Sequence, residues 1–150
     1  MASAIMGGLL RQGMPPDQLV VIEPFEAQRA QLKAQLGVQA LAEAGPALQE
    51  CQVVVWAIKP QIFKEAAVPV RPFVGQALHL SVAAGIRTDS MVQWLGTERW
   101  VRAMPNTPAL VGKGMTGLFA RDAVSAAERQ TIEQLLNSTC LLYTSDAADE

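Results

Sequence analysis

Residues 51–60, Cys-Gln-Val-Val-Val-Trp-Ala-Ile-Lys-Pro, decide the fold of this chain. The run 53–58 is continuously apolar, as expected of a parallel strand that helices cover on both faces. Pro60 has no backbone N–H and disfavours an α conformation at Lys59, so the strand must end before this pair. The segment therefore predicts a buried strand with a conformationally restricted loop at its carboxyl end.

Strand-like and helix-like segments alternate on both sides of this run. Further strands are expected at 19–22, 38–41, 77–82, 100–104 and 116–120, and helices before Gly13 and at 25–36, 61–73, 88–95 and 125–136. Strands that alternate with helices build right-handed βαβ units. The pattern predicts an α/β domain with an open, mostly parallel sheet and helices on both faces.

Local signals sharpen these expectations. Pro69 and Pro72 should interrupt the helix of 61–73. Thr88 should cap the helix of 88–95, and Gly96 should end it. Ser125 and Glu128 have the spacing of a capping box. The strand at 116–120 is expected at an edge of the sheet.

Composition excludes several classes of function. The 150 residues carry a formal net charge of −2, with 50% hydrophobic and 17% charged residues, and no dense cluster of cations suggests a nucleic-acid partner. No apolar run approaches the roughly 20 residues of a membrane span. Two cysteines favour a reducing compartment, so we expect a cytoplasmic protein. The sequence contains no cluster of His and Cys that would predict a metal site. It also contains no Ser-His-Asp order that would predict a hydrolase.

A Rossmann-type sheet would need a glycine-rich phosphate turn between its first strand and first helix. The chain has no G-x-G-x-x-G, and Gly7-Gly8 falls within the first expected helix. We therefore expect a Rossmann-type sheet that lacks its first strand, with that strand and its turn upstream of Met1.

Ligands of such sheets bind at the carboxyl ends of the strands. Glu23 there could accept hydrogen bonds from a ribose and favour NAD, or could simply be solvated. Lys59 could line a cofactor or be a surface lysine. The small residues 83–85 could admit a ring or only pack tightly. Asn106-Thr107, bracketed by prolines, could be a preorganised polar pair or an Asx-turn. His79, inside an expected strand, is interpreted as a core residue.

Several blocks together resemble pyrroline-5-carboxylate reductase, an NAD(P)H-dependent enzyme that reduces a cyclic imine to L-proline. They are Met1-Ala-Ser-Ala-Ile with Gly-Gly-Leu, Val-Val-Val-Trp-Ala-Ile-Lys-Pro-Gln, Ser-Val-Ala-Ala-Gly-Ile, and Arg-Ala-Met-Pro-Asn-Thr-Pro-Ala-Leu-Val-Gly. The resemblance runs in order from Met1 to about Ser138.

The resemblance implies NADP or NAD as cofactor and hydride transfer to 1-pyrroline-5-carboxylate. It implies cofactor contacts for Met1, Glu23, Ala57, Ile58, Lys59, Pro60, Val82, Ala83 and Ala84, and catalytic positions for Asn106 and Thr107. It also implies that the parent protein is a homo-oligomer joined through a helical domain. Glu23 departs from the small polar residue typical of NADP-preferring members.

The family resemblance divides the chain into residues 1–139, an incomplete NAD(P)-binding domain, and residues 140–150. The latter look like the translation of a sequencing adapter, so we expect them to be foreign and the fragment to be inactive. Two alternatives remain open: another Rossmann reductase of the β-hydroxyacid dehydrogenase type, and a non-enzymatic dinucleotide-binding module.

Overall fold

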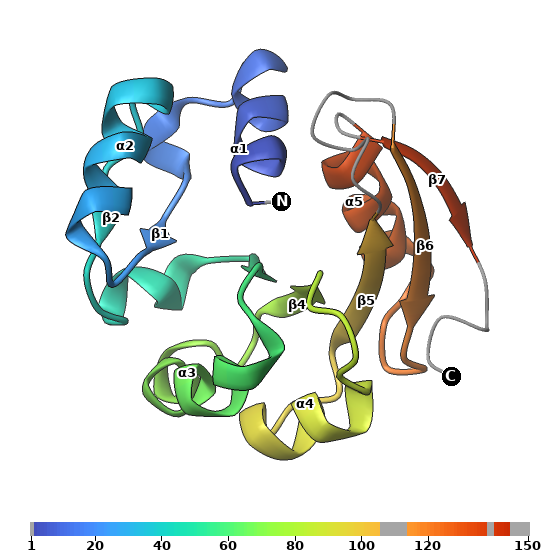
Figure 1. The fold of residues 1–150 in the computed structure, drawn as a ribbon. Coiled ribbons are helices and arrows are strands. Elements are labelled where there is room, and N and C mark those ends of the chain that lie inside the picture. The colour runs from blue at the N-terminus through green and yellow to red at the C-terminus, as the bar shows by residue number, and fades with distance from the viewer. Residues whose placement is uncertain (1, 106–113, 138–139, 145–150) are drawn as a thin grey trace.

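The computed structural model of the chain describes residues 2–105, 114–137 and 140–144 (Figure 1). Its helices are α1 (Ala2–Arg11), α2 (Glu26–Leu36), α3 (Phe63–Val70), α4 (Thr88–Leu95) and α5 (Ala126–Asn137). Its strands are β1 (Val21–Ile22), β2 (Ala40–Leu41), β3 (Val53–Trp56), β4 (Leu78–Ser81), β5 (Trp100–Pro105), β6 (Gly114–Ala120) and β7 (Cys140–Thr144). Short 3-10 turns occur at Pro16–Gln18, Pro46–Glu50, Pro60–Ile62 and Arg71–Phe73.

The strands form two sheets. One has five strands in the order β3-β4-β5-β6-β7, and the other contains only β1 and β2. Every pairing is parallel except that of β5 with β6. This arrangement confirms the expected α/β class with a mostly parallel sheet.

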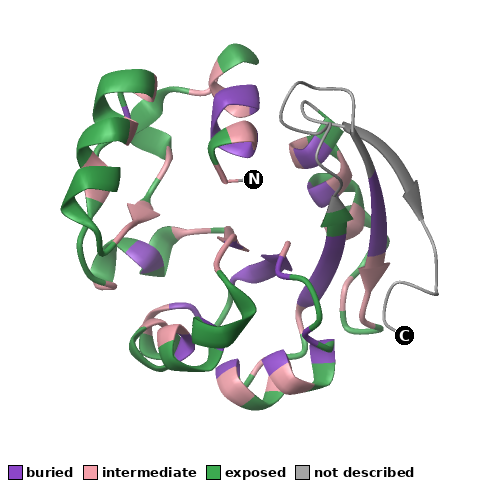
Figure 2. Ribbon diagram, viewed as in Figure 1, coloured by how far each residue is buried: buried purple, intermediate pink, exposed green. Residues whose placement is uncertain are grey.

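Helices cover both faces of the larger sheet (Figure 2). Successive side chains of a strand point to opposite faces, and so neighbouring residues of β5 belong to different core clusters. Leu80 and Val101 point to a cluster that includes Ile5 of α1 and Ile132 of α5. Trp100 belongs to the opposite cluster, which contains residues of α3 and α4. The two cores explain why the β3 and β4 segments are so rich in apolar residues.

The face covered by α3 and α4 is built from aromatic rings. The Trp56 ring stacks on Phe63 with centroids 4.9 Å apart, and Trp100 lies 6.1 Å from each of them. His79 is fully buried in this group, and its Nδ1 accepts a hydrogen bond of 3.0 Å from the Trp56 indole N–H. The interpretation of His79 as a core residue is confirmed.

Several local expectations are also confirmed. The Ser125 hydroxyl accepts the Glu128 backbone N–H at 3.1 Å, and the Glu128 carboxylate accepts the Ser125 N–H at 3.0 Å, which is the reciprocal pattern of a capping box. Gly96 ends α4 with a φ of 74°, a left-handed conformation that glycine adopts without strain.

The expected interruption of the helix of 61–73 near Pro69 and Pro72 is confirmed, because α3 ends at Val70, one residue after Pro69, and a separate 3-10 turn contains Pro72. Two expectations are wrong. Thr88 does not cap α4: it is the helix's first residue, and its hydroxyl accepts a hydrogen bond from Arg121 instead. Strand β6 is not at an edge, since it pairs with β5 on one side and with β7 on the other.

Candidate functional site at the carboxyl ends of the strands

The carboxyl ends of the parallel strands β3, β4 and β5 lie together at one edge of the larger sheet. The pairing register places Trp56 beside Ser81, and Ser81 beside Arg102. Beyond these pairs, the Val82 backbone N–H donates a 3.1 Å hydrogen bond to the Trp56 carbonyl. The segments 57–60 and 82–84, predicted from sequence to share a site, therefore do emerge side by side.

The segment after β3 is a short loop that leads into the turn Pro60–Ile62. Ala57 and Ile58 are half-buried, whereas Lys59 and Pro60 are exposed. Lys59 has φ −68° and ψ 140°, the extended conformation that a following proline favours. Its carbonyl accepts the Ile62 N–H at 3.2 Å, which closes the turn Pro60–Ile62. The backbone is thus fixed, and the amino group of Lys59 remains accessible.

The segment after β4 combines a buried and an exposed alanine. Val82 is half-buried, Ala83 is 4% exposed and Ala84 is exposed. The buried Ser81 hydroxyl accepts the Ala83 N–H at 3.2 Å, which fixes the start of the turn. Gly85 has a φ of 75°, and a side chain there would meet no atom within 4 Å, so its backbone conformation rather than crowding calls for glycine. Small side chains leave this part of the edge open to a flat ring.

Glu23 follows β1, in the smaller sheet. Its N–H donates to the Leu41 carbonyl at 2.8 Å, and its carboxylate accepts the Phe25 N–H at 2.9 Å, at the start of α2. The Arg29 guanidinium donates to the carbonyl oxygens of Glu23 and Pro24, not to the carboxylate. The acid therefore holds the turn into α2 and has lone pairs left for a hydroxyl donor.

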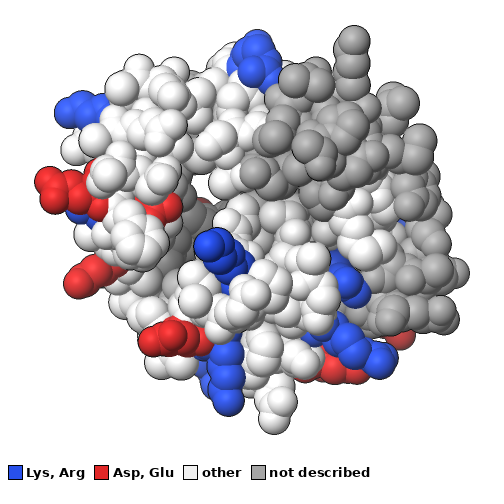
Figure 3. All heavy atoms as spheres, viewed as in Figure 1, with Lys and Arg blue, Asp and Glu red and all other residues white. Residues whose placement is uncertain are grey.

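Met1, Asn106 and Thr107, the other predicted site residues, lie outside the described residues. The spheres in Figure 3 show the surface hollowed between the lobe of α2, β1 and β2 and the rest of the molecule. Within the described ranges, no three His, Cys, Asp or Glu side chains gather in a way that could hold a metal ion.

One long-range contact, at the amino end of β5 and so at the opposite end of the sheet, was missed from sequence. The Arg121 guanidinium donates to Asp89 at 2.6 Å, to Glu98 at 2.7 Å and to the buried Thr88 hydroxyl at 3.0 Å. It thereby ties the first turn of α4, which follows the segment 82–84, to the end of β6. These hydrogen bonds and its charge hold the pKa of Asp89 below its ordinary value. Because 32 residues separate the ion-paired Arg121 and Asp89, no local pattern could have predicted the pair.

No helix in the described part of the chain is both long enough and apolar enough to cross a bilayer.

Comparison with known proteins shows which family the chain belongs to. Residues 1–85 match the family model described as "NADP oxidoreductase coenzyme F420-dependent". The chain belongs to this family. The match ends at Gly85 and therefore includes both predicted cofactor segments of the larger sheet.

Relatives of this family are similar over the whole chain. A pyrroline-5-carboxylate reductase of Pseudomonas aeruginosa is 37% identical over 151 residues, covering 99% of this chain and 55% of the relative. The solved structure of a Coxiella burnetii pyrroline-5-carboxylate reductase superposes with a TM-score of 0.89 at 29% identity, over 97% of this chain and 55% of that one. The Plasmodium falciparum enzyme with NADP bound shares the fold, with a TM-score of 0.81 at 20% identity over 96% and 53% of the two chains.

These comparisons confirm the predicted resemblance to pyrroline-5-carboxylate reductases. The chain spans about half the length of the curated relatives that it matches, 55% for the Pseudomonas protein.

Proposed function

We propose that this chain is part of the cofactor-binding domain of a pyrroline-5-carboxylate reductase. The single observation that carries the proposal is the 37% identity to the Pseudomonas reductase across 99% of the chain. The adjacent segments 57–60 and 82–84 at one sheet edge support it, because that is where an α/β sheet of this kind binds its ligand.

The residues present fit an NADP or NAD cofactor. Exposed Ala84 and half-buried Ala57 leave the edge open to a planar ring, and Lys59 could hydrogen-bond to a ribose. Ala83 and Pro60 would fix the backbone of the two segments that contact the cofactor. Glu23 would accept hydrogen bonds from the adenosine ribose, which favours NAD over NADP. Ile58, Val82 and Met1 would complete the contacts on the basis of the family resemblance.

When bound, the reduced nicotinamide supplies the hydride that adds to the imine carbon of 1-pyrroline-5-carboxylate, and the product is L-proline. The chain's own groups bind and orient, since a protonated imine is already a good hydride acceptor. Asn106 and Thr107 are assigned to the gap between nicotinamide and substrate. The full protein is proposed to be a cytoplasmic homo-oligomer.

We further propose that residues 1–139 form an incomplete domain. In support, β1-β2 and the sheet that begins with β3 are separate, and a parallel strand between β1 and β3 would join them into one doubly wound sheet. The chain also contains no glycine-rich phosphate turn. The 150-residue chain alone is accordingly expected to be inactive.

Residues 140–150 are proposed to be foreign to the gene. The pairing of residues 140–144 as β7 does not argue against this, because backbone ladder hydrogen bonds form between extended segments of many sequences. Reading the genomic DNA across residues 135–150 decides the matter: an uninterrupted natural frame that encodes the same tail contradicts the proposal.

A chimera tests the proposed reaction. Residues 2–137 would replace the matching segment of the Pseudomonas reductase, so that the relative supplies the preceding strand and the following domain. We expect oxidation of NADPH or NADH that depends on 1-pyrroline-5-carboxylate. Asn106→Ala should lower kcat, and Asn137→Ala, at the exposed end of α5, should leave it unchanged.

Two outcomes would overturn the proposal. A folded chimera that reduces 2-oxo acids but not the imine would place the chain with the β-hydroxyacid dehydrogenases. A folded chimera that binds dinucleotide without any turnover would identify it as a binding module.

A further inference from the structure

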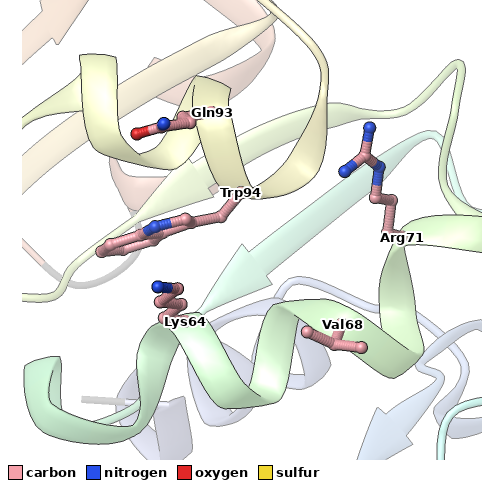
Figure 4. A pocket seen from close by; sticks show the side chains of 5 residues that line it. All are labelled: Lys64, Val68, Arg71, Gln93 and Trp94. Carbon is pink, nitrogen blue, oxygen red and sulfur yellow. The ribbon is translucent and has the colours of Figure 1, made fainter.

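A groove lies between α3 and α4, and none of the residues that line it is assigned to the cofactor. It has a volume of about 320 Å³ and is lined by Lys64, Val68, Arg71, Gln93 and Trp94 (Figure 4). Lys64, Val68 and Arg71 are spaced i, i+4, i+7, so they share one face of α3 and the turn that continues it. Gln93 and Trp94 come from α4, on the opposite wall.

The groove is positively charged and contains no acid. Lys64 and Arg71 are exposed, and neither is within ion-pair distance of a carboxylate in the described ranges. By contrast, Arg99 and Arg121 are both paired with carboxylates. In the lower half of Figure 3, where Figure 1 places α3 and α4, basic side chains lie among acidic ones. The two groove cations are therefore available to an anion from outside.

The groove also offers apolar surface that is held in place. Val68 is 69% exposed, and Trp94 is half-buried. The Trp94 ring packs with its centroid 5.8 Å from that of fully buried Phe63, which in turn stacks on Trp56. Figure 4 shows the Lys64 amino group directed toward the indole ring. An aromatic ring that enters the groove would contact the Trp94 indole, which Phe63 holds in place from the core side. The cations Lys64 and Arg71 line the same groove.

We propose that this groove binds a planar organic anion, an aromatic carboxylate. Its ring would lie against Trp94 and Val68, and its carboxylate would pair with Lys64 or Arg71. Inorganic phosphate would leave the apolar wall unused, and a neutral ring would leave the cations unused, so the combination selects for both features. The volume is within the range of small-molecule sites. The site is separate from the sheet edge and does not depend on the proposed function.

The test follows the indole N–H resonances of the full 150-residue chain by NMR during titration with 2-naphthoate. Trp94 should shift saturably, while the buried Trp56 and Trp100 indoles should stay nearly unchanged and report that the core is intact. The double substitution Lys64→Gln with Arg71→Gln should weaken binding by about tenfold, as expected for the loss of charge-assisted contacts. Lys33→Gln, an exposed cation on α2, is the matched control and should leave binding unchanged.

Two further probes keep the proposal testable without any substitution. Binding of 2-naphthoate to the unmodified chain should weaken with added salt, and 2-naphthamide or inorganic phosphate should bind much more weakly. The proposal is overturned if 2-naphthoate leaves the Trp94 resonance unmoved or if the neutral amide binds equally well. It is also overturned if Lys33→Gln weakens binding as much as the double substitution.

Discussion

The buried His79 predicts a loss of stability in mild acid. Burial is the main cause that lowers the pKa of its imidazole from 6.5 to about 4. The unfolded chain therefore binds a proton between these two values that the folded chain does not bind. The free energy of unfolding is at its full value above about pH 6.5 and falls as the pH drops toward about 4.

The magnitude follows from the size of the shift. A difference of about 2.5 pKa values at about 1.36 kcal/mol each limits the total loss to about 3 kcal/mol, of which about 2 kcal/mol is lost between about pH 7 and pH 5. The contact at stake is the 3.0 Å hydrogen bond from the Trp56 indole N–H, because protonated Nδ1 can no longer accept it. His79 is the single histidine of the chain, so few other groups titrate in this window.

Urea unfolding followed by tryptophan fluorescence at about pH 7, 6 and 5 measures this loss. His79→Gln keeps a hydrogen-bond acceptor but does not titrate, so its free energy of unfolding should be nearly constant over the same window. The lowered pKa values of Asp89 and Glu128 contribute only in more acidic solution, below the ordinary range of carboxyl groups. The reasoning is refuted if the unmodified chain is equally stable at pH 7 and pH 5. It is also refuted if the free energy of unfolding of His79→Gln falls between these pH values as much as that of the unmodified chain.

Three further substitutions test local features of the fold. Ser125→Ala removes half of the capping box and should lower the free energy of unfolding by about 1 kcal/mol in urea, whereas Ser125→Thr should restore most of it. Gly96→Ala places a side chain at a φ of 74° and should cost about 1 to 2 kcal/mol, measured in the same way. Arg121→Met should speed amide hydrogen exchange in the first turn of α4 but not in α5; equal exchange in α4 would contradict its clamping role.

Much of the fold could be predicted from local sequence. The apolar run that contains β3, the glycine that ends α4 and the capping box of α5 depend on neighbouring residues, and each was found where its pattern predicted it. The errors have a different origin. Thr88 bonds to a distant arginine instead of capping its own helix, and β6 gains a neighbour from the segment 140–144.

The sheet-edge site was only partly accessible from the sequence. Because parallel strands end at a common edge, the sequence placed Lys59-Pro60 and Ala83-Ala84-Gly85 at the same edge, and the Val82–Trp56 backbone hydrogen bond shows that the two segments leave the sheet as neighbours. The contacts of Arg121 with Asp89, at the other end of the sheet, could not be predicted, since they join residues 32 apart that only folding brings together.

The sequence by itself determined the class of fold, the order of strands and helices and the family, because apolar periodicity, turn residues and motifs are local properties of the chain. Only the tertiary structure decided which charges remain unpaired and which aromatic rings they face. The stripe Lys64, Val68 and Arg71 is visible in the sequence, yet it forms a groove only because α4 packs Trp94 opposite it. Likewise, His79 is an ordinary histidine until burial against Trp56 and Trp100 removes it from water and lowers its pKa.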